Sequence, residues 1–378
     1  MRAEIDPFHA VSIGRLAYRL QAEGRSIIHM EYGQPSAGAP KAAIAAAHKV
    51  LDSDALGYWE NPALKARIAR HYQETYGLQV DPEQVNLTCG ASPALVLALA
   101  ATFSPGDRVA LARPGYVAYR NVLKALHMVP VEIPCGPSER FQLTASALRA
   151  LGEPPAGVIV ASPANPTGSI IPAEELDAIA QVCRGFGARI VSDETYHGLS
   201  YGAPTRSMLE FEPRALLINS FSKYFNMVGW RLGWLLVPRD EAHRAHAYLA
   251  NMFLTAPSLS QHAGLVAMDC REELEGHVAV YRENRRLMLQ ALPALGLNAI
   301  APPDGAFYIY ADIGHLTGDS LAFCERLLLE TGVAAAPGVD FDPVEGGHFI
   351  RFSFAVSTEE VREALRRLEP WFQARSPV

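Results

Sequence analysis

The segment GVIVASPANPTGSIIPAEELDAIAQVCRGFGARIVSD (157–193) contains two apolar runs separated by a helix-like stretch. The runs GVIVAS (157–162) and ARIVSD (188–193) are typical of strands that are covered on both faces, as in a parallel sheet. A strand, a helix and a second strand in this order predict a doubly wound α/β fold.

The same alternation of apolar strand-like runs and helix-like stretches extends from residue 84 to residue 237. Five more strand candidates are QVNLTC (84–89), RVALA (108–112), VPVEI (129–133), ALLINS (215–220) and RLGWLLV (231–237). From about residue 272 the pattern changes to a long amphipathic helix (272–295), a strand (305–313), a helix (320–332), a strand (348–356) and a last helix from Thr358. We expect a large domain, residues 41–275, around a mostly parallel seven-stranded sheet. Residues 1–40 and 276–378 should form a smaller α+β domain.

The composition excludes several classes of protein. The 378 residues are 49% hydrophobic, which is enough for a sizeable core, and the net charge is −7 without a basic block, which argues against nucleic acid as a partner. Five scattered cysteines without a CxxC pair favour neither a disulfide framework nor a zinc site. The N-terminus lacks the apolar core of a signal peptide, and the richest apolar run is about half of a membrane span. We expect a cytoplasmic protein without a bound metal or a membrane partner.

In open α/β sheets, ligands bind outside the carboxyl ends of the strands, so the residues after each strand are the candidates for chemistry. The first strand is followed by GASPAL (90–95), in which Gly90 allows a tight turn and Ser92 is a good helix N-cap. Free backbone N–H groups at such a helix start can hold a phosphate. An ordinary capped helix remains the alternative.

Two further strands end in polar residues. PANPTG (163–168) forms a rigid turn that presents Asn165 at the sheet edge, although a plain turn has the same composition. Asp193 ends the next strand, three residues before Tyr196. A carboxylate there needs a partner, because an unpaired buried charge is costly. A helix cap or a surface ion pair is the alternative role for Asp193.

The segment NSFSKYFNMVGWRLGW (219–234) brings Ser220, Ser222, Lys223 and Arg231 to the same edge. Hydroxyl groups and a forked guanidinium suit a phosphate. An amine beside another cation in apolar surroundings has a lowered pKa and becomes a nucleophile, whereas a lysine on the surface would be solvated among other charges.

Arg351 lies in a strand-like run between Ile350 and Phe352. A buried arginine needs an anion, which either a protein carboxylate or a substrate carboxylate could supply. A phosphate cradle, a nucleophilic lysine and an aspartate for a ring nitrogen are together what pyridoxal phosphate requires.

The sequence resembles the class I/II aminotransferases over nearly its whole length. These are fold-type I pyridoxal-phosphate enzymes typified by aspartate aminotransferase. The motifs occur in family order: EYGQPSAGAP (31–40), LGYWENPALKARIARHY (56–72), LTCGASPAL (87–95), RPGYVAYRN (113–121), SPANPTG (162–168), SDETYHGLSY (192–201), NSFSKYFNMVGWRLGW (219–234) and IRFSFA (350–355).

The resemblance implies a role for each residue at the strand ends. Lys223 would form the Schiff base and move the proton between the substrate Cα and C4′ of the cofactor. Asp193 would pair with the pyridine nitrogen. Asn165 and Tyr196 would hydrogen-bond the phenolic oxygen of the ring, and Tyr116 would stack on the ring.

Other matched positions would hold the phosphate and the substrate. The implied phosphate cup comprises Gly90, Ala91, Ser92, Ser220, Ser222 and Arg231. Tyr58 would cross a dimer interface to the phosphate of the neighbouring chain. Arg351 would bind the substrate α-carboxylate beside Asn165, and Gly33 lies in the N-terminal segment that closes over the substrate. Tyr32 and Gln34 are further candidates for the side-chain pocket.

The implied function is transfer of an amino group between an L-amino acid and a 2-oxo acid by a ping-pong cycle, in a homodimer with shared active sites. A C–S β-lyase or a decarboxylase using the same cofactor is the alternative, because the early chemistry is shared. The effector domain of a transcription regulator is a third reading, but no basic recognition helix precedes the matched region.

Overall fold

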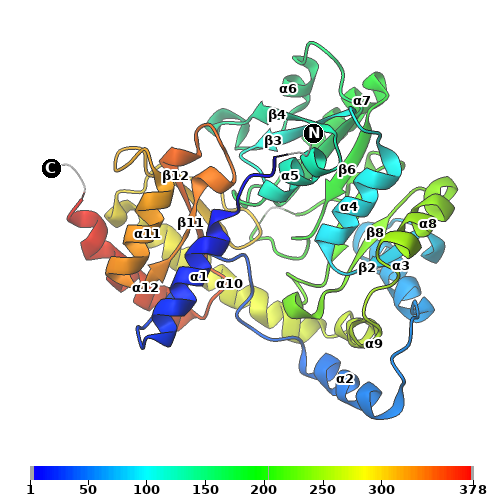
Figure 1. Cartoon of the computed structure of the whole chain (residues 1–378), viewed down its shortest axis with the longest axis horizontal. Helices are drawn as coiled ribbons and strands as arrows, with labels where there is room; N and C mark the ends of the chain where they lie inside the picture. The colour runs from blue at the N-terminus through cyan, green and yellow to red at the C-terminus, as the bar shows by residue number, and fades with distance from the viewer. Residues whose placement is uncertain (1–3, 203, 376–378) are drawn as a thin grey trace.

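The computed structural model describes residues 4–202 and 204–375. Its largest sheet has seven strands in the order β2-β8-β7-β6-β5-β3-β4 (Figure 1). Their bounds are β2 Val85–Thr88, β3 Arg108–Arg113, β4 Val129–Pro134, β5 Gly157–Ala161, β6 Arg189–Asp193, β7 Leu216–Ser220 and β8 Gly233–Leu236. All seven predicted strands are therefore confirmed. Among the described strands, the two antiparallel pairings, β2 with β8 and β7 with β8, both involve β8, so the sheet is mostly parallel, as expected.

The strands of this sheet are mostly apolar because helices cover both faces, and the edge strand β4 is the one that is largely only partly buried. In β5, Ile159 packs into the cluster that also contains residues of α4, whereas Val158 and Val160 pack into the cluster that contains residues of α7. The helices of this part are α2 Lys41–Ser53, α3 Pro62–Tyr76, α4 Ala91–Thr102, α5 Val117–Ala125, α6 Ala145–Arg149, α7 Ala173–Phe186, α8 Ala242–Met252 and α9 Ser258–Ala267. The doubly wound arrangement is confirmed.

A second, smaller unit is built on the antiparallel sheet β11-β12-β9. Its strands are β9 Tyr308–Asp312, β11 Ala336–Pro337 and β12 Phe349–Ser353, and its helices are α1 His9–Ala22, α10 Arg271–Ala291, α11 Ser320–Thr331 and α12 Thr358–Gln373. The N-terminal segment joins this unit because β1 Ile28–His29 pairs in parallel with β10 Val333–Ala334. The four C-terminal elements predicted from about residue 305 are present.

Helix α10 connects the two units (Figure 1). Near its start, Leu274 packs into the core of the large sheet, and one turn later Val278 packs into the core of the small unit. The predicted division at residue 275 remains a prediction, which these two separate clusters support. No helix in the described part of the chain is long and apolar enough to cross a membrane.

Candidate active site

A cavity of about 260 Å³ lies at the carboxyl ends of the central strands. Most of the residues predicted from the sequence line it: Gly33, Ala91, Ser92, Tyr116, Asn165, Asp193, Tyr196, Ser220, Ser222, Lys223, Arg231 and Arg351. Tyr32 and Gln34 also line it. Segments that are far apart in the sequence therefore meet at one edge of the sheet, as the strand-end rule requires.

The N-terminus of α4 forms one wall of this cavity. The helix begins at Ala91, and its N-cap is Gly90, so the prediction that Ser92 caps the helix is wrong. No side chain accepts a hydrogen bond from the first turn, which leaves backbone N–H groups available to an anion. Gly90 has φ 103°, and a Cβ there would lie 2.4 Å from Nη2 of Arg231. The backbone conformation therefore requires glycine, and any other residue would also displace the guanidinium of Arg231.

Two serines and an arginine face this helix start. The Ser220 hydroxyl donates to Oγ of Ser222 at 2.8 Å, and the Ser222 N–H donates to Oγ of Ser220 at 2.9 Å. Arg231 donates through Nη1 to the carbonyl of Val228 at 2.9 Å, and no carboxylate of the described residues pairs with it. Hydroxyls, free N–H groups and an uncompensated guanidinium are the donor set of a phosphate site.

Lys223 extends into the cavity beside this cradle. Its ammonium donates to the carbonyl of Gly33 and lies 5.9 Å from the ring centre of Tyr196. Burial, together with the positive charges of Arg351 and Arg231, lowers the pKa of Lys223 to about 8, against the opposing charge of Asp193. An uncharged, nucleophilic fraction of the amine is therefore available near neutral pH.

Asp193 is held at the end of β6 by two donors. Tyr119 donates its hydroxyl to Oδ2 at 2.7 Å, and the N–H of Thr195 donates to Oδ1 at 3.0 Å. Burial and the nearby Asp193 charge raise the pKa of Tyr119, which keeps its hydroxyl a donor. The sequence analysis missed Tyr119. Its spacing, three residues after Tyr116 in RPGYVAY, is the signal that could have placed it on the same face of α5.

Arg351 is almost fully buried on β12, with 2% of its surface exposed. Its Nη1 donates to Oδ1 of Asn165 at 2.7 Å and its Nη2 to the carbonyl of Glu31 at 2.5 Å, while Nε has no hydrogen-bond partner. None of the ion pairs in the described residues includes Arg351. A buried guanidinium without a carboxylate favours an external anion as its partner.

The wall between Arg351 and Lys223 contains a second residue that the sequence analysis missed. The hydroxyls of Tyr196 and Tyr308 hydrogen-bond at 2.6 Å, and the guanidinium of Arg351 lies 4.5 Å from the ring centre of Tyr308. A Cβ at Gly33 would lie 1.9 Å from Oη of Tyr308, so only glycine allows this approach. The run GAFYIY gave no signal that Tyr308 faces the site. Residues on both faces of this strand are apolar or aromatic, so the sequence does not show which face points to the cavity.

Tyr58 lies outside this cavity. Its side chain is 85% exposed, and it is not among the residues that line the cavity. A role toward a neighbouring chain therefore remains a prediction.

The residues present fit pyridoxal phosphate, the cofactor that the resemblance implies. The cradle of α4, Ser220, Ser222 and Arg231 supplies donors for a phosphate, and the oriented Asp193 supplies an acceptor for a protonated ring nitrogen. Lys223 has the depressed pKa that covalent binding to an aldehyde requires. Within the described ranges, no cluster of three or more His, Cys, Asp or Glu side chains could hold a metal ion.

Comparison with known proteins agrees with this geometry. The profile of the family described as aminotransferase class I and II matches residues 25–368. The valine–pyruvate aminotransferase of Mycobacterium tuberculosis is 47% identical over 98% of this chain and 97% of its own. The crystal structure of an aminotransferase from the same species superposes with a TM-score of 0.95 at 46% identity, covering 98% of this chain and 97% of that one.

A more distant structure shows the same architecture. The aspartate aminotransferase of Thermus thermophilus with maleate superposes with a TM-score of 0.90 at 31% identity, and each chain is covered to 97%. The similarity to these aminotransferases covers almost the whole length of each chain. It does not favour the lyase or decarboxylase alternative. The chain belongs to the class I and II aminotransferases and is a pyridoxal phosphate-dependent enzyme that uses an amino acid and a 2-oxo acid.

Proposed function

We propose that this aminotransferase acts on a branched aliphatic L-amino acid, with pyruvate as the amino acceptor. The observation that carries the proposal is the charge inventory of the cavity. Among the described lining residues the cations are Lys223, Arg231 and Arg351, and each has a task in the site. No cation remains for a second substrate carboxylate, while Phe8, Tyr32 and Val228 offer apolar surface. The name of the relative from Mycobacterium tuberculosis supports the same substrate pair.

We further propose a role for each residue in the reaction. The α4 N-terminus, Ser220, Ser222 and Arg231 bind the phosphate group. Tyr116 would stack on the cofactor ring, and Asn165 and Tyr196 would hydrogen-bond its phenolic oxygen. These contacts fix the ring in one orientation, which converts a bimolecular encounter into a positioned reaction.

Arg351 binds the α-carboxylate of the substrate in a forked geometry and so directs the Cα–H bond toward Lys223. When bound, pyridoxal phosphate supplies an electron sink for the charge that is left at Cα. Asp193 supports that chemistry because Tyr119 and Thr195 hold its carboxylate in the orientation that keeps the ring nitrogen protonated. With the cofactor bound, the amine of Lys223 would be the general base for the Cα proton and then the general acid that returns it at C4′.

The substrate proposal predicts the outcome of a half-reaction screen. Each amino acid is mixed with the cofactor-loaded enzyme without a keto acid, and loss of the visible absorption of the bound cofactor is followed. We expect valine, leucine and isoleucine to react faster than aspartate by roughly 10²-fold, because a second carboxylate would lie unpaired against an apolar wall. Faster reaction with aspartate would contradict the substrate class. Repeated release of pyruvate and ammonia from cysteine would instead indicate a lyase.

The lowered pKa of Lys223 predicts how the apoprotein captures its cofactor. The uncharged amine is the reactive form, so the capture rate should rise with pH and level off above about 8, well below the ordinary lysine value of 10.5. The rate is measured from the growth of visible absorption after mixing with pyridoxal phosphate. Arg351→Gln removes a neighbouring positive charge and should move the inflection to higher pH. An inflection at pH 10 or above in the unmodified chain would refute the buried-amine explanation.

We propose that the chain forms a homodimer through an apolar patch, defined as Tyr58, Trp59, Met252 and Leu254. All four side chains are exposed, Tyr58 to 85%. The two segments are joined, because the carbonyl of Trp59 accepts a hydrogen bond from Thr255 at 3.0 Å. Exposed apolar surface of this kind marks an interface. The five cysteines, all among the described residues, are unpaired, which supports a reducing cytoplasmic location.

Dimer formation through this patch predicts a shared phosphate site. Light scattering should give a mass twice the 41.1 kDa of one chain. Tyr58→Phe removes only the hydroxyl and should raise the dissociation constant of pyridoxal phosphate by roughly tenfold, because a hydrogen bond to a charged group is lost. Tyr248→Phe, an exposed tyrosine of α8, serves as the matched control. A monomeric mass, or equal effects of the two variants, would overturn the proposal.

A further inference from the structure

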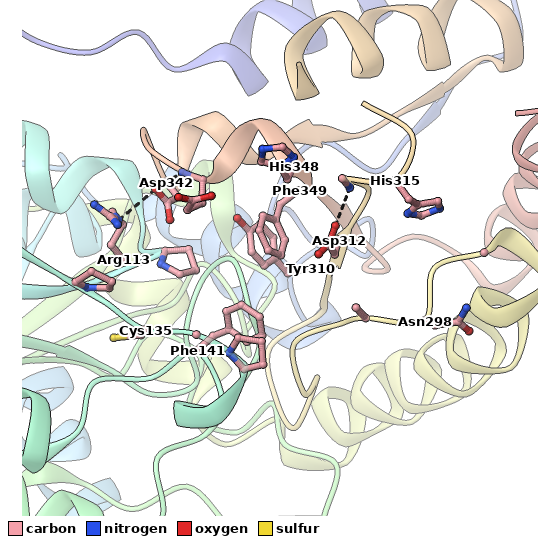
Figure 2. Close-up of a pocket in the computed structure, with 18 residues that line it drawn as sticks. Arg113, Cys135, Phe141, Asn298, Tyr310, Asp312, His315, Asp342, His348 and Phe349 are labelled. Atoms are coloured by element: carbon pink, nitrogen blue, oxygen red, sulfur yellow. Dashed lines mark hydrogen bonds and ion pairs between the residues drawn. The ribbon is translucent and has the colours of Figure 1, made fainter. Parts of the chain in front are cut away.

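A second cavity, of about 860 Å³, opens between the large and small units. We call it the interdomain cleft. The strand β3, the loop after β4 and the segment around Phe141 line it from the large unit, and β9, β12 and the loops near them line it from the small unit. None of its lining residues lines the active-site cavity, so it is a separate space. Figure 2 shows Arg113 and Asp342 at one end, the rings of Phe141, Tyr310 and Phe349 in the middle, and Asp312 and His315 at the other end.

The middle of the cleft is an aromatic surface. The rings of Tyr310 and Phe349 are stacked, with centroids 4.8 Å apart and planes at 6°. Phe141 meets both edge-on, at 6.3 Å from Tyr310 and 6.1 Å from Phe349. Tyr310 is 1% exposed, and its hydroxyl has no hydrogen-bond partner among the described residues. This hydroxyl is itself covered, as is most of the Phe141 ring, so Phe349, which is only partly buried, presents the ring surface that an occupant of the cleft would meet first.

The charges that line the cleft are unbalanced toward the negative. Arg113 already forms an ion pair with Asp342, with Nε 3.2 Å from Oδ1 but without a hydrogen bond from Nε, and the N–H of Val344 donates to the same oxygen at 2.8 Å. Asp312 accepts only the N–H of Gly314, at 2.7 Å, and no ion pair in the described residues includes Asp312. The side chain of Glu345 likewise has no cationic partner there. Two carboxylates therefore remain uncompensated next to three aromatic rings.

We propose that the interdomain cleft binds an organic cation, an ammonium group carried on an apolar body, and that its occupancy alters substrate binding at Arg351. Ring faces attract a cation through their quadrupole, and the two unpaired carboxylates add Coulomb attraction of the same sign. An anion would be repelled by the two carboxylates and would find no free guanidinium, because the one arginine among the described lining residues, Arg113, is already paired. The size and the mixture of rings with a few polar groups are typical of a small-molecule site.

The coupling to the active site follows from shared elements. Phe349 and Arg351 are two residues apart on β12, so an occupant against Phe349 touches the strand that carries the substrate arginine. Behind the cleft, Tyr310 packs edge-on against Phe341 at 6.2 Å, and the ring centre of Phe341 lies 4.7 Å from the Arg351 guanidinium. An occupant that touches both units changes how the small unit, and with it Arg351, sits over the cofactor domain.

The test uses the cofactor-loaded enzyme and benzyltrimethylammonium as the probe. A quaternary ammonium has no N–H and cannot react with the cofactor aldehyde, so the visible spectrum should stay unchanged while calorimetry measures binding. We expect one probe per chain and binding at least about tenfold tighter than that of the neutral isostere benzyl alcohol. We also expect saturating probe to change KM for the amino acid severalfold.

Three variants locate the bound probe. Asp312→Asn combined with Glu345→Gln removes both unpaired charges and should weaken probe binding by roughly tenfold or more. Phe349→Leu keeps apolar volume but removes a ring face and should weaken it by about fivefold. Glu23→Gln removes an exposed charge that does not line the cleft, and it should change nothing.

The outcomes are separable. Absence of probe binding, or equal binding of the probe by the double variant and the Glu23→Gln control, would overturn the site. Probe binding that leaves KM unchanged would overturn its coupling to Arg351. Thermal unfolding of each variant with an unchanged midpoint ensures that a loss of binding is not a loss of fold. The binding measurement does not depend on which amino acid is the substrate.

Discussion

Replacement of Lys223 by alanine is expected to abolish transamination, with a loss of roughly 10⁴-fold or more in kcat, and to remove the absorption band of covalently bound cofactor. The reason is that Lys223 supplies both the amine that bonds to the cofactor and the base that moves the Cα proton, and a positioned base alone contributes 10²- to 10⁴-fold. The cradle of α4, Ser220, Ser222 and Arg231 is untouched, so the phosphate should still bind. Absorption spectra and single-turnover kinetics measure the two effects separately.

The matched control is Lys49→Ala, because Lys49 is an exposed lysine on α2 that does not line the active-site cavity. It should keep the spectrum and the activity of the unmodified enzyme. Lys223→Arg keeps a cation in place but supplies no nucleophilic amine, so it should be as inactive as the alanine variant. A Lys223→Ala enzyme with an unchanged spectrum would remove Lys223 from its assigned role.

Replacement of Arg351 by alanine should lower kcat/KM for amino acids by roughly 10²- to 10³-fold, with the cofactor spectrum retained. A buried charge pair that loses one partner typically costs 2–5 kcal/mol, about 30- to 4,000-fold in binding. The loss should lie mainly in KM, because Arg351 holds the carboxylate in the ground state as well as in the transition state. Steady-state kinetics with the preferred amino acid give both constants.

A substrate comparison distinguishes this binding role from a structural one. The reaction of isobutylamine, which lacks a carboxylate, should be nearly the same in the variant and in the unmodified enzyme. Arg351→Lys keeps the charge but not the forked geometry, so it should be intermediate. Equal losses for the amine and the amino acid would mean that Arg351 supports the fold of the site rather than the substrate.

The large sheet could be predicted from the sequence because strands buried on both faces must be apolar along their whole length. GVIVAS comes close to this property and most of the other six runs are mainly apolar, whereas VPVEI gave a partly buried edge strand with Glu132; all seven became strands within a residue or two of their predicted bounds. The small unit was predicted less directly, because the only described strand through which its N-terminal part pairs with the rest, β1, has two residues. So short a strand has no periodicity that could be recognised.

Part of the site was also predictable, because parallel strands bring their carboxyl ends to one edge. From that rule alone, Asp193, Ser220 and Lys223 are expected at one site, and all three line the active-site cavity. It could not identify Tyr119 or Tyr308, whose roles depend on the direction in which a side chain points. The predicted N-cap of α4 was also wrong. Serine is a common N-cap residue, which favoured Ser92, but the turn at Gly90 decides where the helix begins.

The sequence by itself determined the order of strands and helices, the family and the residues at the strand ends, because these depend on local periodicity and on motifs. Only the tertiary structure decided what surrounds Arg351, how far the pKa of Lys223 falls, and that an acidic, aromatic cleft lies between the two units. Each of these depends on distances between residues from separate parts of the chain, such as Arg351 and Asn165, which are 186 positions apart. Burial and Coulomb interactions depend on how close these residues lie in the folded chain, and the linear sequence does not give those distances.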